Sequence, residues 1–468
     1  MSSATYGELI KGNRNFRRLW TGQVISELGT WFSFIAELGL IRMFSGSPLA
    51  TTALLVARLL PFLMVAPFAG VFVDRLSRKR IMIATDIIRA AVALLYLAAA
   101  AAGSVWAVCL CSALMSSLAV FFEAAKNAAM PNLVAPRELL TANILMYSTR
   151  FLQFTLGAAL GGVTAARFGY NIAFVVDSAS FVASALYVAL IPAATMKRQA
   201  KAQSSTVAAA ASSASELQVD KETSLVDVLA AEEVCGATVH ASEQVVQSPA
   251  RFTSDLREGL HYIWTTPFVR GVILVNIGWA MGGGMHSVLF DQIGGHLFAQ
   301  GERGDWSVAM LFTASGVGLF IGMAMARRIG GWMSKERRAS HFVGWSLIAH
   351  GLIFSAGGLM PSLALVALCI GMSRLVIAAE FGVQETMVMR VIPDEYRGRV
   401  FTTDRALELG MMTISMIIGG WMLKAMSPLT VMIVSGLLSA IPGIAWLLAV
   451  KFAEFRIPAR AVRESYGD

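Results

Sequence analysis

The chain has 468 residues, of which 56% are hydrophobic and only 15% are charged, and its formal net charge is +8. Its mean hydropathy is +0.63. Because soluble proteins are roughly one quarter charged, this composition excludes a soluble multidomain protein, a disordered chain and a disulfide scaffold. The four cysteines show no metal-site spacing, and we predict neither a metal nor a cofactor.

Apolar runs long enough to cross a membrane recur along the chain. A spanning helix needs about 20 mostly apolar residues, and twelve such runs occur. They lie near 19–44, 49–72, 81–102, 105–128, 139–166, 170–192, 268–297, 306–328, 341–360, 362–388, 400–423 and 429–451. The sequence therefore predicts an all-α integral membrane protein with twelve transmembrane helices.

The positively charged residues lie mainly on one side of the predicted membrane. Of the 38 Lys and Arg, those in connections on the other side are Arg42, Arg167, Arg303 and Lys424. Because positive residues favour the cytoplasmic side, we predict that both termini are cytoplasmic, in the plasma (cell inner) membrane. The net charge is then explained by topology, and no nucleic-acid partner is expected.

Residues 193–250 interrupt the apolar pattern with Ala, Ser and Gln, followed by acidic positions. This composition predicts a flexible cytoplasmic linker between an N-terminal six-helix bundle, 1–192, and a C-terminal unit, 251–468. The second unit opens with apolar residues at helical spacing, among them Phe252, Leu256 and Leu260. We expect an amphipathic helix there, lying on the cytoplasmic membrane surface before the second six-helix bundle.

The first span carries a polar stripe that we assign to a substrate and proton cavity. Its members fall within about 80° on a helix and are Gln23, Ser26, Thr30, Ser33 and Glu37. A charge in mid-membrane costs roughly 2.5–3.5 kcal/mol, so Glu37 is the predicted proton-coupling or cation-recognising carboxylate. The alternative is a solvated position near the external mouth. Asn276 and Asp291 on the seventh span and Arg150 on the fifth complete the predicted cavity.

Other charges within the spans are predicted to form intramembrane charge clamps. These residues are Asp86, Arg89, Asp177, Asp404, Arg405 and Glu408. Asp86 and Arg89 are one helical turn apart, a spacing at which opposite charges neutralise each other. Arg405 and Glu408 repeat that spacing. Asp177 has no local partner, so it must pair across helices or line the cavity.

Enzyme motifs are missing from the sequence. It contains no H-E-x-x-H zinc motif, no G-x-x-x-x-G-K-[ST] loop and no G-x-S-x-G elbow. We therefore expect no enzymatic activity and no ATP-driven pump, and an ion gradient is the expected energy source.

The connection after the second span carries the most specific signal. It runs from Gly70 through Asp74 and Arg75 to Arg78 and Lys79. This segment resembles the signature of the major facilitator superfamily, with Ser77 at the usual second glycine. The resemblance implies two pseudo-symmetric six-helix bundles that rock about a central site. It also implies that these five residues form a conformational latch; the alternative is that the basic residues only set orientation.

Shorter matches resemble the exporter branch that includes macrolide-efflux and enterobactin-export proteins. They include Gly29-Thr30-Trp31, Arg58-Leu59-Leu60-Pro61 and Asp177-Ser178-Ala179-Ser180-Phe181. The run from Gly157 to Gly162 is similar to an antiporter signature, with Ala158 in place of its proline. In the second half, Ala326 stands where a matching latch would carry Asp.

Together these features predict a monomeric secondary active transporter in the lipid bilayer. We expect proton-coupled efflux of an amphipathic small molecule of drug, macrolide or siderophore type. One alternative is a lysolipid flippase or nutrient uptake carrier of the same fold. The other is a non-transporting membrane scaffold or sensor whose linker recruits a partner.

Overall fold

The computed structural model describes residues 6–135, 138–196, 249–300, 303–332 and 336–451, and these residues form helices and no strands. The helices of the first half are α1 (Tyr6–Gly12), α2 (Arg14–Phe44), α3 (Pro48–Arg75), α4 (Arg78–Ala101), α5 (Val105–Leu133), α6 (Leu139–Phe168) and α7 (Tyr170–Ala189). Those of the second half are α10 (Pro249–Thr265), α11 (Pro267–Gly283), α12 (His286–Gln292), α13 (Asp305–Trp332), α14 (Glu336–Gly357), α15 (Leu363–Val391), α16 (Asp394–Ala425) and α17 (Pro428–Lys451). A short 3₁₀ helix follows α7 at Ala193–Met196, and a π-helical segment follows α12 at Ile293–Leu297.

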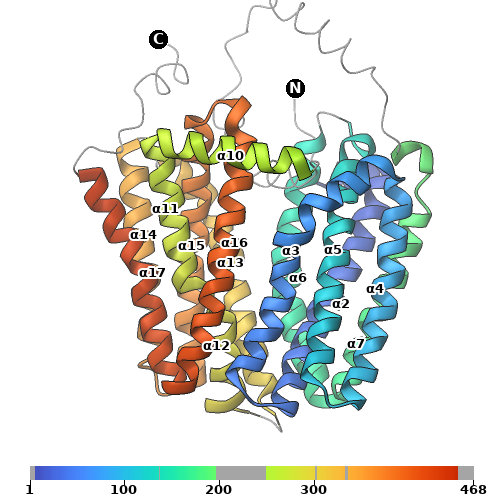
Figure 1. Ribbon diagram of the computed structural model, residues 1–468, viewed down its shortest axis with the longest axis horizontal. Coiled ribbons are helices and arrows are strands. Elements are labelled where there is room, and N and C mark those ends of the chain that lie inside the picture. The colour runs from blue at the N-terminus through green and yellow to red at the C-terminus, as the bar shows by residue number, and fades with distance from the viewer. Residues whose placement is uncertain (1–5, 136–137, 197–248, 301–302, 333–335, 452–468) are drawn as a thin grey trace, which may run out of the picture.

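The long helices form two bundles side by side (Figure 1). In the first, α2 packs on α6 and α7 while α4 packs on α5 and α7; in the second, α13 packs on α15 while α14 packs on α15 and α17. The bundles meet where α6 contacts α13 and α3 contacts α16. We call this interface the seam. Following the predicted orientation, the end of the molecule that carries α10 is called the inner end and the opposite end the outer end.

Ten segments are long and apolar enough to cross a membrane among the residues described, with α11 and α12 counted as one. The helices α6 and α14 lie beside them and complete six long elements in each bundle. The exterior is also apolar: Trp106 is 76% exposed, and Leu110 and Leu186 are each 62% exposed. Many large apolar side chains exposed on the exterior are typical of a surface in contact with lipid and not with water. This agrees with the predicted membrane architecture.

The seventh predicted span, 268–297, is one helix interrupted after Gly283. A Cβ on Gly282 would overlap the Ser439 side chain of α17, and a Cβ on Gly284 would lie 2.5 Å from the Met412 carbonyl oxygen of α16. The glycine run therefore allows close approach of two neighbouring helices at the point where α11 gives way to α12.

The helix α10 lies across the inner end of the second bundle, roughly at right angles to the long helices (Figure 1). It packs against α16 and α11, and Glu258 pairs with Arg399 of α16 at 2.5 Å. An amphipathic helix was expected in this segment. The predicted linker, 193–250, lies outside the described residues except for 193–196 and 249–250.

Candidate functional site

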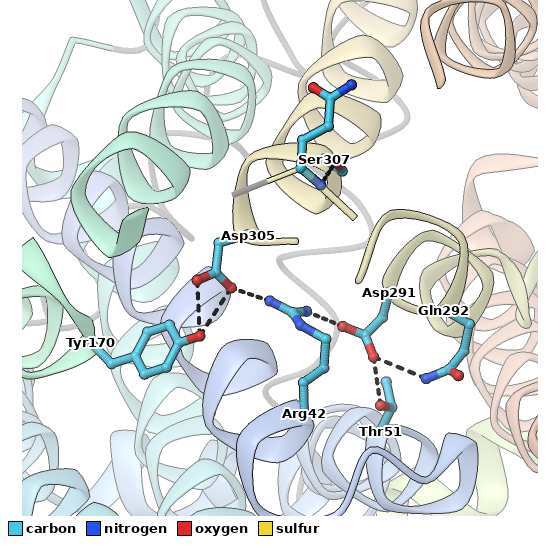
Figure 2. A network of polar contacts seen from close by, with 8 residues as sticks. Arg42, Thr51, Tyr170, Asp291, Gln292, Asp305 and Ser307 are labelled. Carbon is cyan, nitrogen blue, oxygen red and sulfur yellow. Dashed lines mark hydrogen bonds and ion pairs between the residues drawn. The ribbon is translucent and has the colours of Figure 1, made fainter. Parts of the chain in front are cut away.

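A buried ion network joins the two bundles at the outer end. Arg42 lies about 40 Å along α2 from its inner start, and its guanidinium pairs with Asp291 of α12 and with Asp305 of α13. The three side chains are 4%, 0% and 7% exposed. Figure 2 shows Arg42 between the two carboxylates. One cation therefore holds two segments of the second bundle against the first.

Neutral donors complete this network. The Tyr170 hydroxyl donates to both carboxylate oxygens of Asp305, at 2.9 and 3.1 Å. The Thr51 hydroxyl donates to Asp291 at 2.7 Å, and the Gln292 amide donates to the same oxygen at 3.3 Å. We call these six residues the outer network: Arg42, Thr51, Tyr170, Asp291, Gln292 and Asp305. Since two carboxylates share one arginine, the extra hydrogen bonds offset the cost of burying the second negative charge.

The backbone around the outer network leaves no room for other side chains. A Cβ on Gly295 would overlap the Arg42 side chain, and Gly304 has a φ of +69°, a conformation that favours glycine. The Ser307 hydroxyl donates to the Phe298 carbonyl at 2.7 Å and accepts from the Gln300 backbone N–H at 3.0 Å, which ties these two residues to the first turn of α13. This packing positions Asp305 at the first turn of α13.

An aromatic layer lies about 12 Å further into the molecule, two turns of α2 before Arg42. Phe34 of α2 meets Phe312 of α13 edge-on at 5.3 Å between ring centroids, and Phe312 meets Phe290 of α12 at 5.2 Å. Trp31 and Phe154 join from the first bundle, at 4.4 Å from each other. We call these five residues the aromatic layer. Edge-to-face ring pairs of this kind contribute about 0.5–1.5 kcal/mol each beyond burial.

Close helix packing continues the seam at the outer end. A Cβ on Gly162 of α6 would overlap that of Ala309 of α13, and a Cβ on Gly420 of α16 would overlap the Thr52 hydroxyl of α3. The outer network, the aromatic layer and these glycine contacts together close the outer end of the molecule.

Glu37 lies inside the first bundle with a charged partner. Its carboxylate is 1% exposed and accepts hydrogen bonds from Arg58 of α3, at 3.2 and 3.3 Å, and from the Ser112 hydroxyl of α5, at 3.1 Å. Arg58 is 22% exposed and lies 4.8 Å from the centroid of Phe34 in the aromatic layer. The alternative of a solvated Glu37 at the external mouth is wrong, because the side chain is enclosed.

The rest of the predicted stripe on α2 is turned toward its own helix and α7. The hydroxyls of Ser26, Thr30 and Ser33 donate to α2 carbonyls three or four residues earlier. A Cβ on Gly29, between them, would overlap Ser180 and lie 2.8 Å from Asp177 on α7. Gln23 donates to Glu27 at 2.9 Å. Their assignment to the cavity stays a prediction.

The other predicted cavity residues are dispersed. Asp291 lies in the outer network. Asn276 donates to Asp404 of α16 at 3.0 Å, so it links α11 to α16. Arg150 is exposed on α6 and interacts electrostatically with Glu123. The structure thus does not bring the eight predicted cavity residues together in one place.

The predicted charge clamps include two local pairs of very different burial. Arg89 pairs with Asp86, which is 0% exposed, and the guanidinium lies between Phe122 and Phe181 at 4.7 and 4.4 Å from their ring centroids. Arg405 pairs with Glu408 at 2.6 Å, but its side chain is 56% exposed. Only the first pair is enclosed by protein.

The described part of the predicted latch bonds within the first bundle. Arg78 donates to the Ala128 carbonyl at 2.6 Å, and Lys79 donates to the carbonyls of Ala189 and Ile191 at 2.7 and 2.6 Å. Gly70 is buried and Arg75 is exposed, while the Asp74 side chain lies outside the described part of the structure.

A second arginine lies near the middle of α15 in the second bundle. Arg374 donates to His286 Nδ1 of α12 at 2.6 Å, and its guanidinium lies 5.9 Å from the Phe290 ring centroid. A desolvated cation–π contact contributes about 2 kcal/mol, whereas burial of an unpaired charge costs several kcal/mol.

Several functional candidates carried no clear sequence signal. The sequence analysis did not single out Tyr170, Thr51, Gln292 or Asp305, and it used Arg42 only for topology. Glu380 of α15 is 0% exposed, and neither carboxylate oxygen has a hydrogen-bond partner in the described structure. A charge scan of the tenth span would have found Glu380.

The family model of the Major Facilitator Superfamily matches residues 19–403 of this chain. The putative bacilysin exporter BacE of Bacillus subtilis is 24% identical over 410 residues, which cover 86% of this chain and 88% of that protein. Macrolide efflux protein A of Streptococcus pyogenes is 26% identical over 178 residues, or 38% of this chain and 44% of that protein. An uncharacterized MFS-type transporter of B. subtilis, YfiS, is 26% identical over 185 residues and is likewise matched over 44% of its length.

Solved structures show the same arrangement of helices. The nucleoside transporter NupG superposes with a TM-score of 0.63 over 94% of this chain and all of that one, at 12% identity. A bacterial homologue of the iron transporter ferroportin, in an inward-facing state, gives 0.62 over 92% of this chain and 98% of that one, at 14% identity. These similarities confirm the predicted all-α fold of two six-helix bundles.

Proposed function

The chain belongs to the major facilitator superfamily of membrane transporters, and we propose that it exports an amphipathic small molecule in exchange for protons by alternating access. In this proposal it acts as a monomer in the plasma membrane with both termini in the cytoplasm. The bundles rock about the seam, which opens the central site to one side of the membrane at a time.

The observation that carries this proposal is the outer network. Arg42, Asp291 and Asp305 connect the bundles through buried ion pairs, beside an apolar cluster that also crosses the seam. A contact of this kind separates as one unit when the bundles rock, because its partners lie on opposite sides of the seam. At the inner end, Arg78 and Lys79 donate to carbonyls of the first bundle, and α10 of the second bundle contacts α3 of the first. Closure of the outer end is what an inward-facing state requires.

The relatives favour export as the direction of transport. BacE is named as a putative bacilysin exporter and covers most of this chain, and macrolide efflux protein A matches part of it. The aromatic layer offers ring faces to an apolar part of a substrate, while Arg58 and Arg374 flank it with charge. An amphipathic substrate suits that combination.

Glu37 is the proposed proton-coupling residue. Its carboxylate is enclosed and its charge is balanced by Arg58 at 3.2 Å. A proton on Glu37 would remove the attraction that holds Arg58, which lies against Phe34 of the aromatic layer. Protonation therefore acts on a side chain at the seam.

The latch residues Asp74, Arg75 and Arg78 are proposed to control the inner end, so Asp74→Asn should slow turnover more than it weakens substrate binding.

Expression in a susceptible bacterial host tests the function. A panel of macrolides and small peptide antibiotics is added to cells carrying the chain, Glu37→Gln or an empty vector, and growth and accumulated compound are measured with and without a protonophore. We expect lower accumulation with the chain than with either control, and loss of that difference with the protonophore. Glu27→Gln, on the same helix, is the matched control and should behave as the parent chain.

The alternatives give different results in the same cells. Higher accumulation of a compound indicates an uptake carrier, and movement of a labelled lysolipid between leaflets indicates a flippase. A scaffold or sensor transports nothing, yet it loses its output when residues 199–248 are deleted. A transporter tolerates that deletion, provided that the two bundles still dock.

A further inference from the structure

Arg374 has a positive charge and no carboxylate to balance it. Among the described residues, no Asp or Glu oxygen lies within 4.0 Å of its guanidinium, and its Nε has no hydrogen-bond partner. The guanidinium contacts His286 Nδ1 and the ring of Phe290. By contrast, Arg42 and Arg89, which are also enclosed in the spans, each pair with a carboxylate.

His286 cannot supply the missing negative charge. An arginine only donates hydrogen bonds, so His286 Nδ1 accepts from Arg374 and the ring proton sits on Nε2. That Nε2 is buried and has no acceptor in the described structure. The ring is also held in place, with its centroid 3.9 Å from that of Phe354. Next to the unbalanced guanidinium there is therefore a second N–H without a partner.

His350, beside this pair, is neutral, and both of its ring nitrogens already form hydrogen bonds. The Trp279 indole N–H, which only donates, lies 3.2 Å from His350 Nε2, so Nε2 accepts. The proton is then on Nδ1, which donates to the Ser373 carbonyl at 3.0 Å. His350 has no spare acceptor for Arg374. The whole cluster around Arg374 is thus rich in donors and poor in acceptors.

The free side of Arg374 points away from lipid. The lipid-facing residues of α15 include Leu365, Leu368 and Met372, which are 40%, 57% and 51% exposed. At 100° per residue, Arg374 lies about 120–180° from each of them. The Arg374 side chain is nevertheless partly exposed. Its exposed part therefore faces the interior of the molecule and not the lipid. Phe290 connects it to the aromatic layer at the seam.

We propose that Arg374 and His286 form the binding site for a carboxylate of the transported molecule, whose apolar part lies on Phe290 and the aromatic layer. An unpaired guanidinium beside a free N–H matches an anion in charge and in hydrogen-bond polarity. The proposal rests on the proposed function, because it takes the Arg374 site as part of the transport pathway. It narrows the substrate class to amphipathic carboxylic acids, zwitterions included.

Binding of a matched pair of probes to the purified chain in lipid nanodiscs tests this inference. The probes are dansyl-phenylalanine and its methyl ester, which share the apolar part and differ in the carboxylate. We expect the parent chain to bind the acid about tenfold more tightly than the ester, the effect of one charge-assisted contact. In Arg374→Gln the acid should bind as weakly as the ester, and affinity for the ester should not change. Arg374→Lys should fall between the two, because lysine keeps the charge without the planar fork.

Arg270→Gln is the matched control, since it removes the same charge from the inner end of α11, where Arg270 lies against Trp264. It should leave both affinities unchanged. Equal affinities of the parent chain for acid and ester overturn the proposal, and that comparison needs no variant to fold. Equal weakening of both probes in Arg374→Gln also overturns it. No step of this assay involves transport. If the parent chain does not prefer the acid over the ester, the carboxylate site is rejected and the export proposal stands. If it prefers the acid but cells show no efflux, only the export proposal is rejected.

Discussion

Arg42 and Asp291 are 249 residues apart in the chain, yet they form an ion pair across the seam with both side chains almost fully enclosed. Asp305, 263 residues from Arg42, takes the other side of the same guanidinium. Because a single arginine serves both carboxylates, its removal would leave two enclosed negative charges without a cation at the outer end.

Replacement of Arg42 by Gln should open the outer end. Two enclosed carboxylates would lose their cation, which costs the closed state about 3–5 kcal/mol. We expect faster labelling of a cysteine placed at Ala309, a seam residue that is 2% exposed, by an impermeant maleimide added outside the cell to a chain without its native cysteines. Arg167→Gln removes an exposed arginine outside the outer network and should leave labelling unchanged. Equal labelling in Arg42→Gln and the parent would contradict the role of the outer network.

The contact between Gly162 and Ala309 makes a second prediction about closure. An extra methyl at Gly162 would overlap the Ala309 side chain, and overpacking of this kind costs about 1–3 kcal/mol. Gly162→Ala should therefore lower both the melting temperature in detergent and the export rate. The double variant Gly162→Ala with Ala309→Gly removes the opposing methyl and should restore both.

Gly410→Ala is the control for this pair, because nothing lies within 4 Å of a Cβ at Gly410. It should leave stability unchanged or slightly improved, since alanine favours a helix. If the double variant is as impaired as Gly162→Ala, the overlap with Ala309 is not the cause.

Glu37→Gln tests proton coupling. Gln keeps the shape and one acceptor for Arg58 and Ser112 but cannot ionise. We expect pH-gradient-driven efflux from inside-out vesicles to fall to the level of vesicles without the protein, whereas exchange of labelled for unlabelled substrate persists. Glu27→Gln changes a carboxylate that Gln23 contacts on the same helix and should keep both activities. Undiminished coupled efflux in Glu37→Gln would reject the assignment.

The two local charge pairs should differ strongly in their effect on stability. Asp86→Asn leaves Arg89 enclosed without a carboxylate, which should cost about 3–5 kcal/mol. Glu408→Gln breaks a pair whose arginine is 56% exposed, and such pairs contribute about 1 kcal/mol or less. Thermal unfolding in detergent measures both. Similar losses in the two variants would show that burial does not set their value.

Local regularities made much of the fold predictable. The hydropathy of the chain located the spanning segments because a helix in lipid must be apolar over its whole length. Spacing of one helical turn placed Asp86 beside Arg89 and Arg405 beside Glu408, since residues three apart share a face in every helix. It also grouped the polar residues of the first span on one face.

Tertiary structure decided what each of those faces meets. Helical periodicity gives the direction of a side chain but not the neighbour that packs there, and partners such as Arg42 and Asp291 lie on different bundles. The same applies to Glu37, which the sequence singled out and only the fold pairs with Arg58. Arg374 shows the converse: its charge was visible in the sequence, but the lack of a carboxylate around it depends on the rotation and contacts of α12, α13 and α15. The sequence by itself determined that this is a helical membrane protein, because lipid imposes an apolar helix on each spanning segment separately. The polar stretch 193–250 divided the predicted spans into two sets of six. Which charges close the outer end and which stay unpaired was decided by packing between helices far apart in the chain.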